Sequence, residues 1–234
     1  MKSSNQTKIN LDWLQEQINL QSQIRQESLD CSKIRYIAGV DVAYTNVAEV
    51  EYGCCSIVII DYKTLNVVQK VGYSGKVCVE YIPGFLSFRE LPLILEAVKK
   101  VEITPDIFIF DGNGILHPRR MGIATHASFY LNKPCIGVAK TFFRAEENLD
   151  FDMPENYIGA STNIISNANE TLGVALRTRQ NCRPIFVSVG NYISLEDAKT
   201  VVMHCLNNES RIPIPTRLAD IETHKLREDF LCKE

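Results

Sequence analysis

The chain has 234 residues, of which 45% are hydrophobic and 23% charged, a globular composition that excludes a disordered or fibrous protein. Its formal net charge is -3, so the overall field does not attract a polyanion, and a nucleic acid would have to be held by a local cationic group or by metal. No apolar run is long enough to span a bilayer and the first residues lack a signal-peptide core, so we expect a cytoplasmic protein without membrane contact.

A chain of this length can bury one sizeable core, and we expect a single domain over residues 1–234. The eight cysteines are scattered without any Cys-x-x-Cys pair, and several lie in apolar runs. Reduced, buried thiols are therefore expected, and a zinc site is not. One compact domain without an evident exposed apolar stripe also suggests a monomer.

The first elements are a predicted helix and three predicted strands. Residues 8–29 carry leucine and isoleucine at helical spacing, which predicts a bracing helix within residues 1–30. Three β-rich runs follow at residues 35–44, 52–60 and 66–73. The short connections between them favour an antiparallel meander.

From about residue 87 the pattern changes to alternating helices and strands. A helix through residues 91–101 precedes a strand at 106–111, and a helix near 121–131 precedes a strand at 135–140. Such alternation indicates parallel strands that are joined by crossover helices.

The last part of the chain begins with a polar, asparagine-rich stretch at residues 146–169, which we predict to be a loop. Two strands and then two helices are predicted after it, at residues 171–178, 183–189, 194–206 and 216–231. A capping box from Ser194 to Asp197 opens the first of these helices, and Pro215 precedes the second.

Three antiparallel strands followed by parallel strands with crossover helices form the layout of an α/β fold, a ribonuclease H-like mixed sheet flanked by helices. In that layout the first and fourth strands lie side by side and parallel. Residues near the ends of these two strands are therefore expected to meet at one edge of the sheet.

Two aspartates occupy such positions. Asp41 lies inside a run apolar enough to be a central strand, where an unpaired carboxylate would cost several kcal/mol. Asp111 follows the apolar run IFIF and is the first residue of DGNG. Two carboxylates that close together repel each other unless a divalent metal lies between them, although either one could instead cap a turn.

Two more acids are weaker candidates. Glu90 follows Ser87 at the spacing of a capping box, so a role at the start of a helix competes with a role in a site. Asp220 belongs to the terminal helix and would by default be a solvated charge. Only proximity to the other acids would give it a function, and spacing along the chain does not show that.

The stretch DGNGILHPRRMG (111–122) matches neither an EF-hand, which needs Glu where Gly122 stands, nor a P-loop, which needs Gly-Lys-Ser/Thr. Its glycines allow a ligand close to the backbone. Three of its side chains are candidate phosphate contacts, His117, Arg119 and Arg120. Lys140 ends the fifth strand at the same edge and could clamp a scissile phosphate, or be only a solvated strand end.

Five blocks make the chain resemble the endonuclease V family, in the family's order: AGVDVAY, YIPGFLSFRELP, DGNGILHPRRMGIATH, PCIGVAKT and PTRLAD. The resemblance runs from about residue 34 to residue 225. It implies a ribonuclease H-like fold and a Mg²⁺-dependent nuclease, with Mn²⁺ as a substitute. It also implies cleavage of the second phosphodiester bond on the 3′ side of deoxyinosine in DNA or inosine in RNA, a DNA repair activity.

The resemblance also implies roles for single residues. Asp41 and Asp111 would be the core metal ligands, Glu90 and Asp220 would complete the site, and Lys140 would act with them in catalysis. His117 would contact or polarise the phosphate near the cut, and Tyr81 would be the wedge that props the duplex open. The pocket for the extruded base would be lined by Gly84, Leu86, Gly122 and Ile123.

The chain departs from the family pattern at three places. Glu80 stands where proline usually precedes the wedge tyrosine, and Ile214 replaces a glutamate in the late motif. Asn191 and Tyr192 stand where His-Arg is usual, which removes two potential cations. We expect these changes to affect binding more than metal chemistry.

Two other functions are compatible with the same residues. The chain could be an inosine-binding module that does not cut, although a pure binder has no need of four acids and a lysine. It could also be an endoribonuclease specific for inosine in RNA, because the contacts that read a 2′-hydroxyl leave no signature in one sequence.

Overall fold

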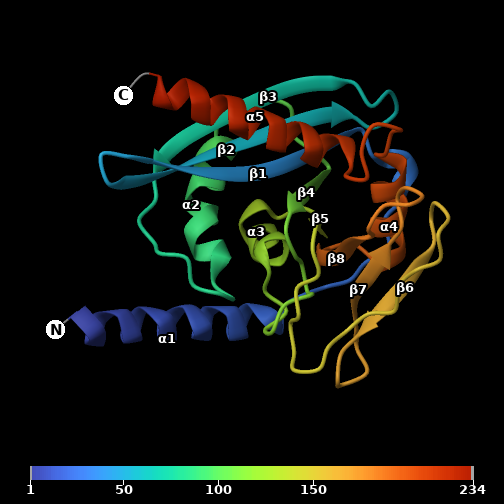
Figure 1. Ribbon diagram of the computed structural model, residues 1–234, viewed down its shortest axis with the longest axis horizontal. Coiled ribbons are helices and arrows are strands. Elements are labelled where there is room, and N and C mark those ends of the chain that lie inside the picture. The colour runs from blue at the N-terminus through green and yellow to red at the C-terminus, as the bar shows by residue number, and fades with distance from the viewer. Residues whose placement is uncertain (1, 233–234) are drawn as a thin grey trace.

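The computed structural model describes the backbone of residues 2–232 and the side chains of residues 11–232. An eight-stranded mixed sheet forms the centre of the molecule, with helices on both of its faces (Figure 1). The elements are, in chain order, α1 (Lys2–Gln21), β1 (Tyr36–Val47), β2 (Val50–Asp61), β3 (Val67–Lys76), α2 (Leu86–Val98), β4 (Ile107–Asp111), α3 (Ile123–Leu131), β5 (Cys135–Ala139), β6 (Ser161–Ile165), β7 (Thr171–Leu176), β8 (Ile185–Asn191), α4 (Leu195–His204) and α5 (Ile214–Leu231).

The sheet has the strand order β3-β2-β1-β4-β5-β8-β7-β6. The first three strands form an antiparallel meander, and β4 pairs parallel with β1 on one side and with β5 on the other. The predicted ribonuclease H-like arrangement is therefore confirmed. The remaining strands are antiparallel to their neighbours, so the parallel part of the sheet is confined to β1, β4 and β5.

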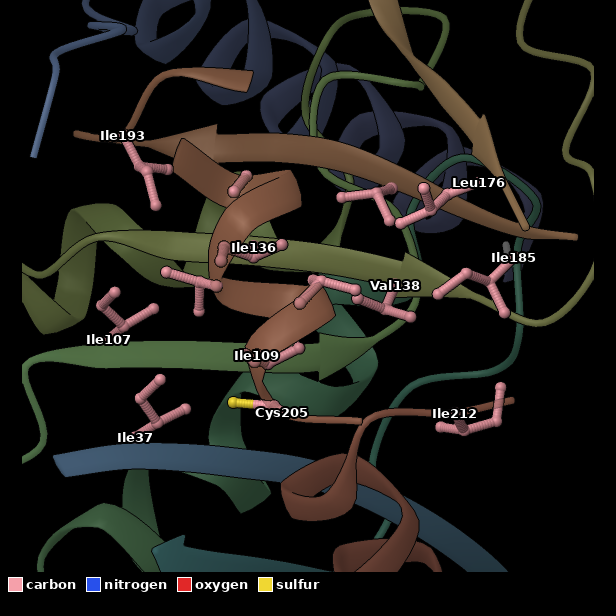
Figure 2. Close-up of a cluster of buried hydrophobic side chains, with 14 of the residues drawn as sticks. Ile37, Ile107, Ile109, Ile136, Val138, Leu176, Ile185, Ile193, Cys205 and Ile212 are labelled. Atoms are coloured by element: carbon pink, nitrogen blue, oxygen red, sulfur yellow. The ribbon is translucent and has the colours of Figure 1, made fainter. Parts of the chain in front are cut away.

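Alternating side chains on the central strands give the sheet two buried faces. Ile37, Ile107 and Ile109 point to the face that α4 and α5 cover, and Figure 2 shows them packed with Ile136 and Cys205. Their neighbours, such as Ala38 and Phe108, point to the opposite face and pack against α2 and α3. Because both faces are covered, these strands are apolar throughout.

The N-terminal helix is shorter than predicted, since α1 ends at Gln21. The chain beyond it is tied to the far side of the sheet, where the amides of Arg25 and Leu29 donate to the side chains of Asn191 and Asp197. These tertiary hydrogen bonds take the place of a further helical turn. In Figure 1, α1 passes near the lower end of α2 rather than along the sheet, and the ring of Trp13 stacks on Phe88 of α2.

The polar stretch 146–169 is not loop throughout, because β6 forms within it and pairs antiparallel with β7. The pairing buries Ile164 completely, while the next residue, Ile165, stays exposed at 48%. One buried side chain and the backbone pairing were enough to make a strand that the composition did not indicate.

The predicted capping box of α4 is confirmed at the amide of Asp197, which donates to the Ser194 hydroxyl. Burial of the thiols is confirmed for four cysteines, Cys54, Cys55, Cys135 and Cys205, whereas Cys78 and Cys232 are exposed. Within residues 2–232, no helix combines the length and the apolar character that crossing a membrane requires.

Candidate active site

Two aspartates meet where β1 and β4 run side by side. The parallel register pairs Val40 with Phe110 as the last of its pairs, so the next residue on each strand is an aspartate, Asp41 or Asp111. Adjacent parallel strands hold equivalent residues about 5 Å apart. The expected meeting of these two acids at one edge of the sheet is thus found.

A third aspartate comes from α5, which packs directly on β1. Gly39 permits this contact, because a Cβ atom there would lie 2.1 Å from the carbonyl carbon of Pro215. The close approach brings Asp220 over the strand ends. One carboxylate oxygen each of Asp41, Asp111 and Asp220 then lies within 4.8 Å of the other two.

Lys140 supplies the positive charge at this cluster. Its ammonium lies 2.6 Å from an Asp111 oxygen and 3.5 Å from an Asp220 oxygen. Burial would lower the pKa of Lys140, but the hydrogen bond to Asp111 and the charges of the aspartates outweigh it and raise that pKa. Lys140 is therefore cationic at neutral pH and directed at the acids rather than at bulk solvent.

Asp41 is fixed from α5 as well. The hydroxyl of Thr223, which is fully buried, lies 2.7 Å from an Asp41 carboxylate oxygen and donates to it. Burial first, and then the charges of Asp111 and Asp220, raise the pKa of Asp41 to about 6 despite this bond. The carboxylate is thus oriented by Thr223, but its ionised form is destabilised.

Glu90 joins Asp41 and Asp111 in lining one small cavity. It accepts a hydrogen bond of 3.0 Å from the hydroxyl of Tyr44. Burial first, and then the charges of Asp41 and Asp111, raise the pKa of Glu90 to about 8, although the hydrogen bond from Tyr44 lowers it. Glu90 therefore belongs to the acidic site.

The competing interpretation of Glu90 as a helix-capping residue is wrong. The residue that precedes α2 is Phe85, and no side chain caps this helix. Ser87, which would have been the capping residue, instead hydrogen-bonds to the ring of His126 at 2.7 Å.

The chemistry of the acidic cluster suits a divalent cation. The cluster consists of Asp41, Glu90, Asp111 and Asp220. Carboxylate oxygens are the ligands that Mg²⁺ and Mn²⁺ prefer. Like charges held this close raise one another's pKa, and a cation among them would remove that penalty. Of the four, Glu90 lies outside the tightest group of ligand atoms.

A second cavity adjoins the acidic one, and Ile123 lines both. All four residues of the predicted base pocket line it, namely Gly84, Leu86, Gly122 and Ile123. Tyr81 is also part of its lining and is 61% exposed. The structure thus brings together every residue that was expected to read or support the base.

The wall formed by YIPGF is a tight turn. The amide of Phe85 donates to the carbonyl of Ile82 at 2.9 Å, and Gly84 has a φ of +81°. Pro83 at the second position and glycine with positive φ at the third define a type II turn. The turn fixes the backbone of this wall, because only glycine adopts that φ without strain.

Each of the candidate phosphate contacts is engaged by the protein, and His117 also lines the second cavity. His117 is buried, and burial lowers its pKa to about 3, so its ring is neutral. Arg119 stacks over Phe85, with its guanidinium carbon 4.4 Å from the ring centroid. Arg120 forms ion pairs of 2.8 Å with Glu146 and with Glu170. Contact of these three with phosphate stays a prediction.

The sequence did not reveal two residues that support the acids. Thr223 orients Asp41, and Tyr44 donates to Glu90. Tyr44 ends the motif AGVDVAY, three residues after Asp41 on the strand, but the motif does not show that its hydroxyl faces Glu90. Thr223 lies outside the motifs, one helical turn after Asp220, and only that position could have indicated it. Tertiary packing alone selects them.

The departures from the family pattern fall in different surroundings. Glu80 is exposed beside Tyr81, and Ile214 is the first residue of α5. Asn191 is fully buried, and its side chain accepts the amide of Arg25. The side chain of Asn191 thus holds the segment after α1 in place, and an effect of these changes on binding stays a prediction.

Comparisons with known proteins find relatives over nearly the whole chain. The family model described as Endonuclease V matches residues 17–221. Endonuclease V of Bacillus thuringiensis subsp. konkukian (strain 97-27) is 53% identical over 232 residues, which cover 99% of this chain and 98% of the relative.

Solved structures of endonuclease V also have the same fold as this chain. The crystal structure of endonuclease V from Bacillus subtilis aligns with a TM-score of 0.92 and 48% identity, covering 96% of this chain and 94% of the other. Endonuclease V of Ciona intestinalis, in complex with a 24mer DNA containing an inosine followed by a ribo-adenosine, aligns with a TM-score of 0.82 and 28% identity. That alignment covers 95% of this chain and 99% of the Ciona chain.

Proposed function

Because the chain belongs to the endonuclease V family, we propose that it is a metal-dependent endonuclease that recognises deaminated adenine in nucleic acid. Its substrates are deoxyinosine in DNA, inosine in RNA, or both, and it hydrolyses the second phosphodiester bond on the 3′ side of the base. The observation that carries the proposal is the acidic cluster directly beside the cavity that Gly84 and Gly122 help to line. The Ciona relative, whose structure holds inosine-containing DNA, supports the choice of base.

Asp41, Asp111 and Asp220, with Glu90 behind them, would hold Mg²⁺, for which Mn²⁺ can substitute. When bound, the metal supplies Lewis-acid polarisation of the phosphate and activation of water. Lys140 lies against Asp111 and Asp220. Its ammonium donates to an oxygen of the scissile phosphate, where negative charge increases during hydrolysis.

The cavity lined by Gly84, Leu86, Gly122 and Ile123 receives the extruded base. Extrusion costs least where pairing is already weakened, so a deaminated base is favoured before any contact is made. Tyr81 is an exposed aromatic residue in the lining of this cavity. Its ring takes the place of the extruded base and replaces the lost stacking.

An endoribonuclease is the second candidate, and one observation favours it. The oligonucleotide bound to the Ciona relative has a ribonucleotide directly after its inosine. A non-cleaving inosine binder is disfavoured, because it would have no need to crowd Asp41, Asp111 and Asp220 around Lys140 at a cost in charge repulsion.

The deciding experiment incubates the purified chain with matched oligonucleotides that contain one deoxyinosine in DNA or one inosine in RNA. Mg²⁺, Mn²⁺ or EDTA is added at equal ionic strength, since affinity for nucleic acid depends strongly on salt. We expect one cut at the second bond 3′ to the lesion with either metal and none in EDTA. Binding without products in Mg²⁺ and in Mn²⁺ would overturn the nuclease proposal, and the ratio of the two cleavage rates identifies the main substrate.

A further inference from the structure

The carbonyl oxygen of Gly84, in the wall of the base cavity, is held by three side chains. The amide of Gln17 lies 3.2 Å from it, the Nε2 atom of His117 3.2 Å and the Nη2 atom of Arg119 2.7 Å. The Nδ1 atom of His117 accepts the backbone amides of Arg119 and Met121, so the proton is on Nε2 and is donated to Gly84. A carbonyl has two lone pairs, so these donors saturate it.

Gln17 links this carbonyl to the N-terminal helix. Its side chain is fully buried, and its oxygen accepts a hydrogen bond from the Nε atom of Arg119 while its nitrogen donates to Gly84. Helix α1 is itself anchored to α2, because the ring of Trp13 stacks on Phe88 with 4.8 Å between centroids. The turn at Gly84 is thus clamped between the DGNG motif region and α1.

The guanidinium of Arg119 is committed to this clamp. Its Nε atom donates to Gln17, its Nη2 atom donates to Gly84, and its face lies over the ring of Phe85. This geometry uses the fork and the flat face of a guanidinium, which lysine does not reproduce. A side chain that only contacted phosphate would need neither the hydrogen bonds to Gln17 and Gly84 nor the stacking on Phe85.

We propose that Arg119, oriented by Gln17, is a positioning residue for base recognition, which fixes the Gly84 carbonyl and with it the backbone that lines the base cavity. The proposal rests on the proposed function and deepens it, because it assigns specificity to a contact outside the cavity lining and to a helix outside the catalytic sheet. It also replaces the phosphate contact that the motif suggested for Arg119.

The two roles of Arg119 differ in how binding responds to salt. A lost phosphate contact weakens binding to every sequence and reduces the slope of log K against log salt concentration by about 1. A lost positioning contact leaves that slope unchanged and weakens binding only where the base must be read. The preference for inosine and the salt slope therefore separate the two roles.

The test measures binding of the full chain, in EDTA so that nothing is cut, to fluorescent oligonucleotides that carry deoxyinosine or deoxyadenosine at one position. Each is titrated at several salt concentrations. We expect Arg119→Gln to reduce the preference for deoxyinosine roughly tenfold or more, as for the loss of a hydrogen bond from a charged group, with an unchanged salt slope. Arg119→Lys, which keeps the charge, is expected to lose the preference as well. Lys99→Gln, which removes an exposed cation at the other end of α2, is the control.

Equal weakening on both oligonucleotides with a smaller salt slope, rescued by Arg119→Lys, would overturn the proposal in favour of a phosphate contact. An unchanged preference in a folded Arg119→Gln variant would overturn it too. If wild-type protein shows no preference for deoxyinosine, the proposed function itself fails, which is a distinct result.

Gln17→Glu provides a second test if Arg119→Gln does not fold, as judged by thermal unfolding. This change keeps the acceptor for Arg119 and removes the donor to Gly84, so we expect a severalfold loss of preference. Gln15→Glu adds the same charge on the same helix, where the exposed side chain bonds only to Asn19, and is expected to bind like wild type. Equal preferences in the two variants would contradict the clamp.

Discussion

The acidic cluster and the base cavity are neighbours that share Ile123, yet they are built in opposite ways. The cluster consists of side-chain carboxylates, and burial and then their mutual repulsion raise the pKa of Asp41 and Glu90. The cavity has glycines and no carboxylate among the residues of its lining, and the carbonyl of Gly84 has all of its hydrogen-bonding capacity used. Charge repulsion destabilises the acidic cluster until a cation binds, whereas hydrogen bonds already fix the wall of the base cavity.

The difference separates chemistry from recognition. Charges held close together store a penalty that a metal can relieve, so the cluster is poised for binding a cation. A cavity with a rigid wall loses little entropy when a base enters, so its selectivity depends on how firmly that wall is held. Substitutions in the two parts should therefore have different consequences.

The largest effect is expected from removing an acid of the cluster. Asp111→Ala deletes a metal ligand and the partner of Lys140, and cleavage of an inosine oligonucleotide should fall by at least about a thousandfold. Binding in EDTA should persist in part, because the base cavity is intact. Gel-based single-turnover rates and anisotropy titrations measure the two quantities. Asp150→Ala, at an exposed acid elsewhere, should match wild type, and an active Asp111→Ala would show that the metal site is misplaced.

The next effect concerns stability without metal. Burial first, and then the charges of Asp41 and Asp111, raise the pKa of Glu90 in the folded chain to about 8, above its unfolded value near 4.5. The folded state therefore binds the extra proton, and its stability is complete below pH 4.5 and declines as the pH rises through 8. The decline should amount to a few kcal/mol, at about 1.4 kcal/mol per pKa unit.

Thermal unfolding in EDTA between pH 5 and pH 9 measures this decline. Glu90→Gln is neutral throughout and should be more stable than wild type at pH 8, with little difference at pH 5. Glu96→Gln, at an exposed acid of the same helix, is the control and should follow the wild-type profile. Parallel profiles for wild type and Glu90→Gln would contradict the electrostatic description of the cluster.

On the recognition side, Tyr81→Ala should weaken binding to inosine-containing DNA by about 1 to 3 kcal/mol, the value of one base stacked on an aromatic ring. Stability should change by less than about 0.5 kcal/mol because the side chain is exposed. Tyr157, which is 54% exposed and outside the cavity lining, gives the matched control Tyr157→Ala. Equal affinities for the two variants in anisotropy titrations would remove Tyr81 from recognition.

The smallest effect is expected at Thr223, which links α5 to the cluster. Thr223→Val removes the hydroxyl that donates to Asp41 and should weaken Mn²⁺ binding severalfold by calorimetry, consistent with about 1 kcal/mol for one hydrogen bond. Thr223→Ser should restore the affinity. Thr200→Val, which removes an exposed hydroxyl bonded only to its own helix, should leave Mn²⁺ binding unchanged.

Much of the fold was predictable because its central strands are apolar on both faces and its helices carry clear periodicity. The parallel pairing of β1 and β4 followed from that order of elements. The strand β6 was missed because its backbone pairing with β7, rather than its polar composition, makes it a strand. The early end of α1 was missed because hydrogen bonds to Asn191 and Asp197, distant in sequence, hold the next segment.

The sequence by itself determined the layout of the sheet and singled out Asp41 and Asp111, because an unpaired carboxylate in or at the end of an apolar strand is costly. Only the tertiary structure decided that Asp220 joins them, since this depends on how closely α5 approaches β1 at Gly39. It also decided that Arg119 holds a turn, because hydrogen bonds between residues about a hundred positions apart leave no pattern along the chain. The periodicity of helices and strands can be seen in the sequence, whereas contacts between distant residues form only when the chain packs.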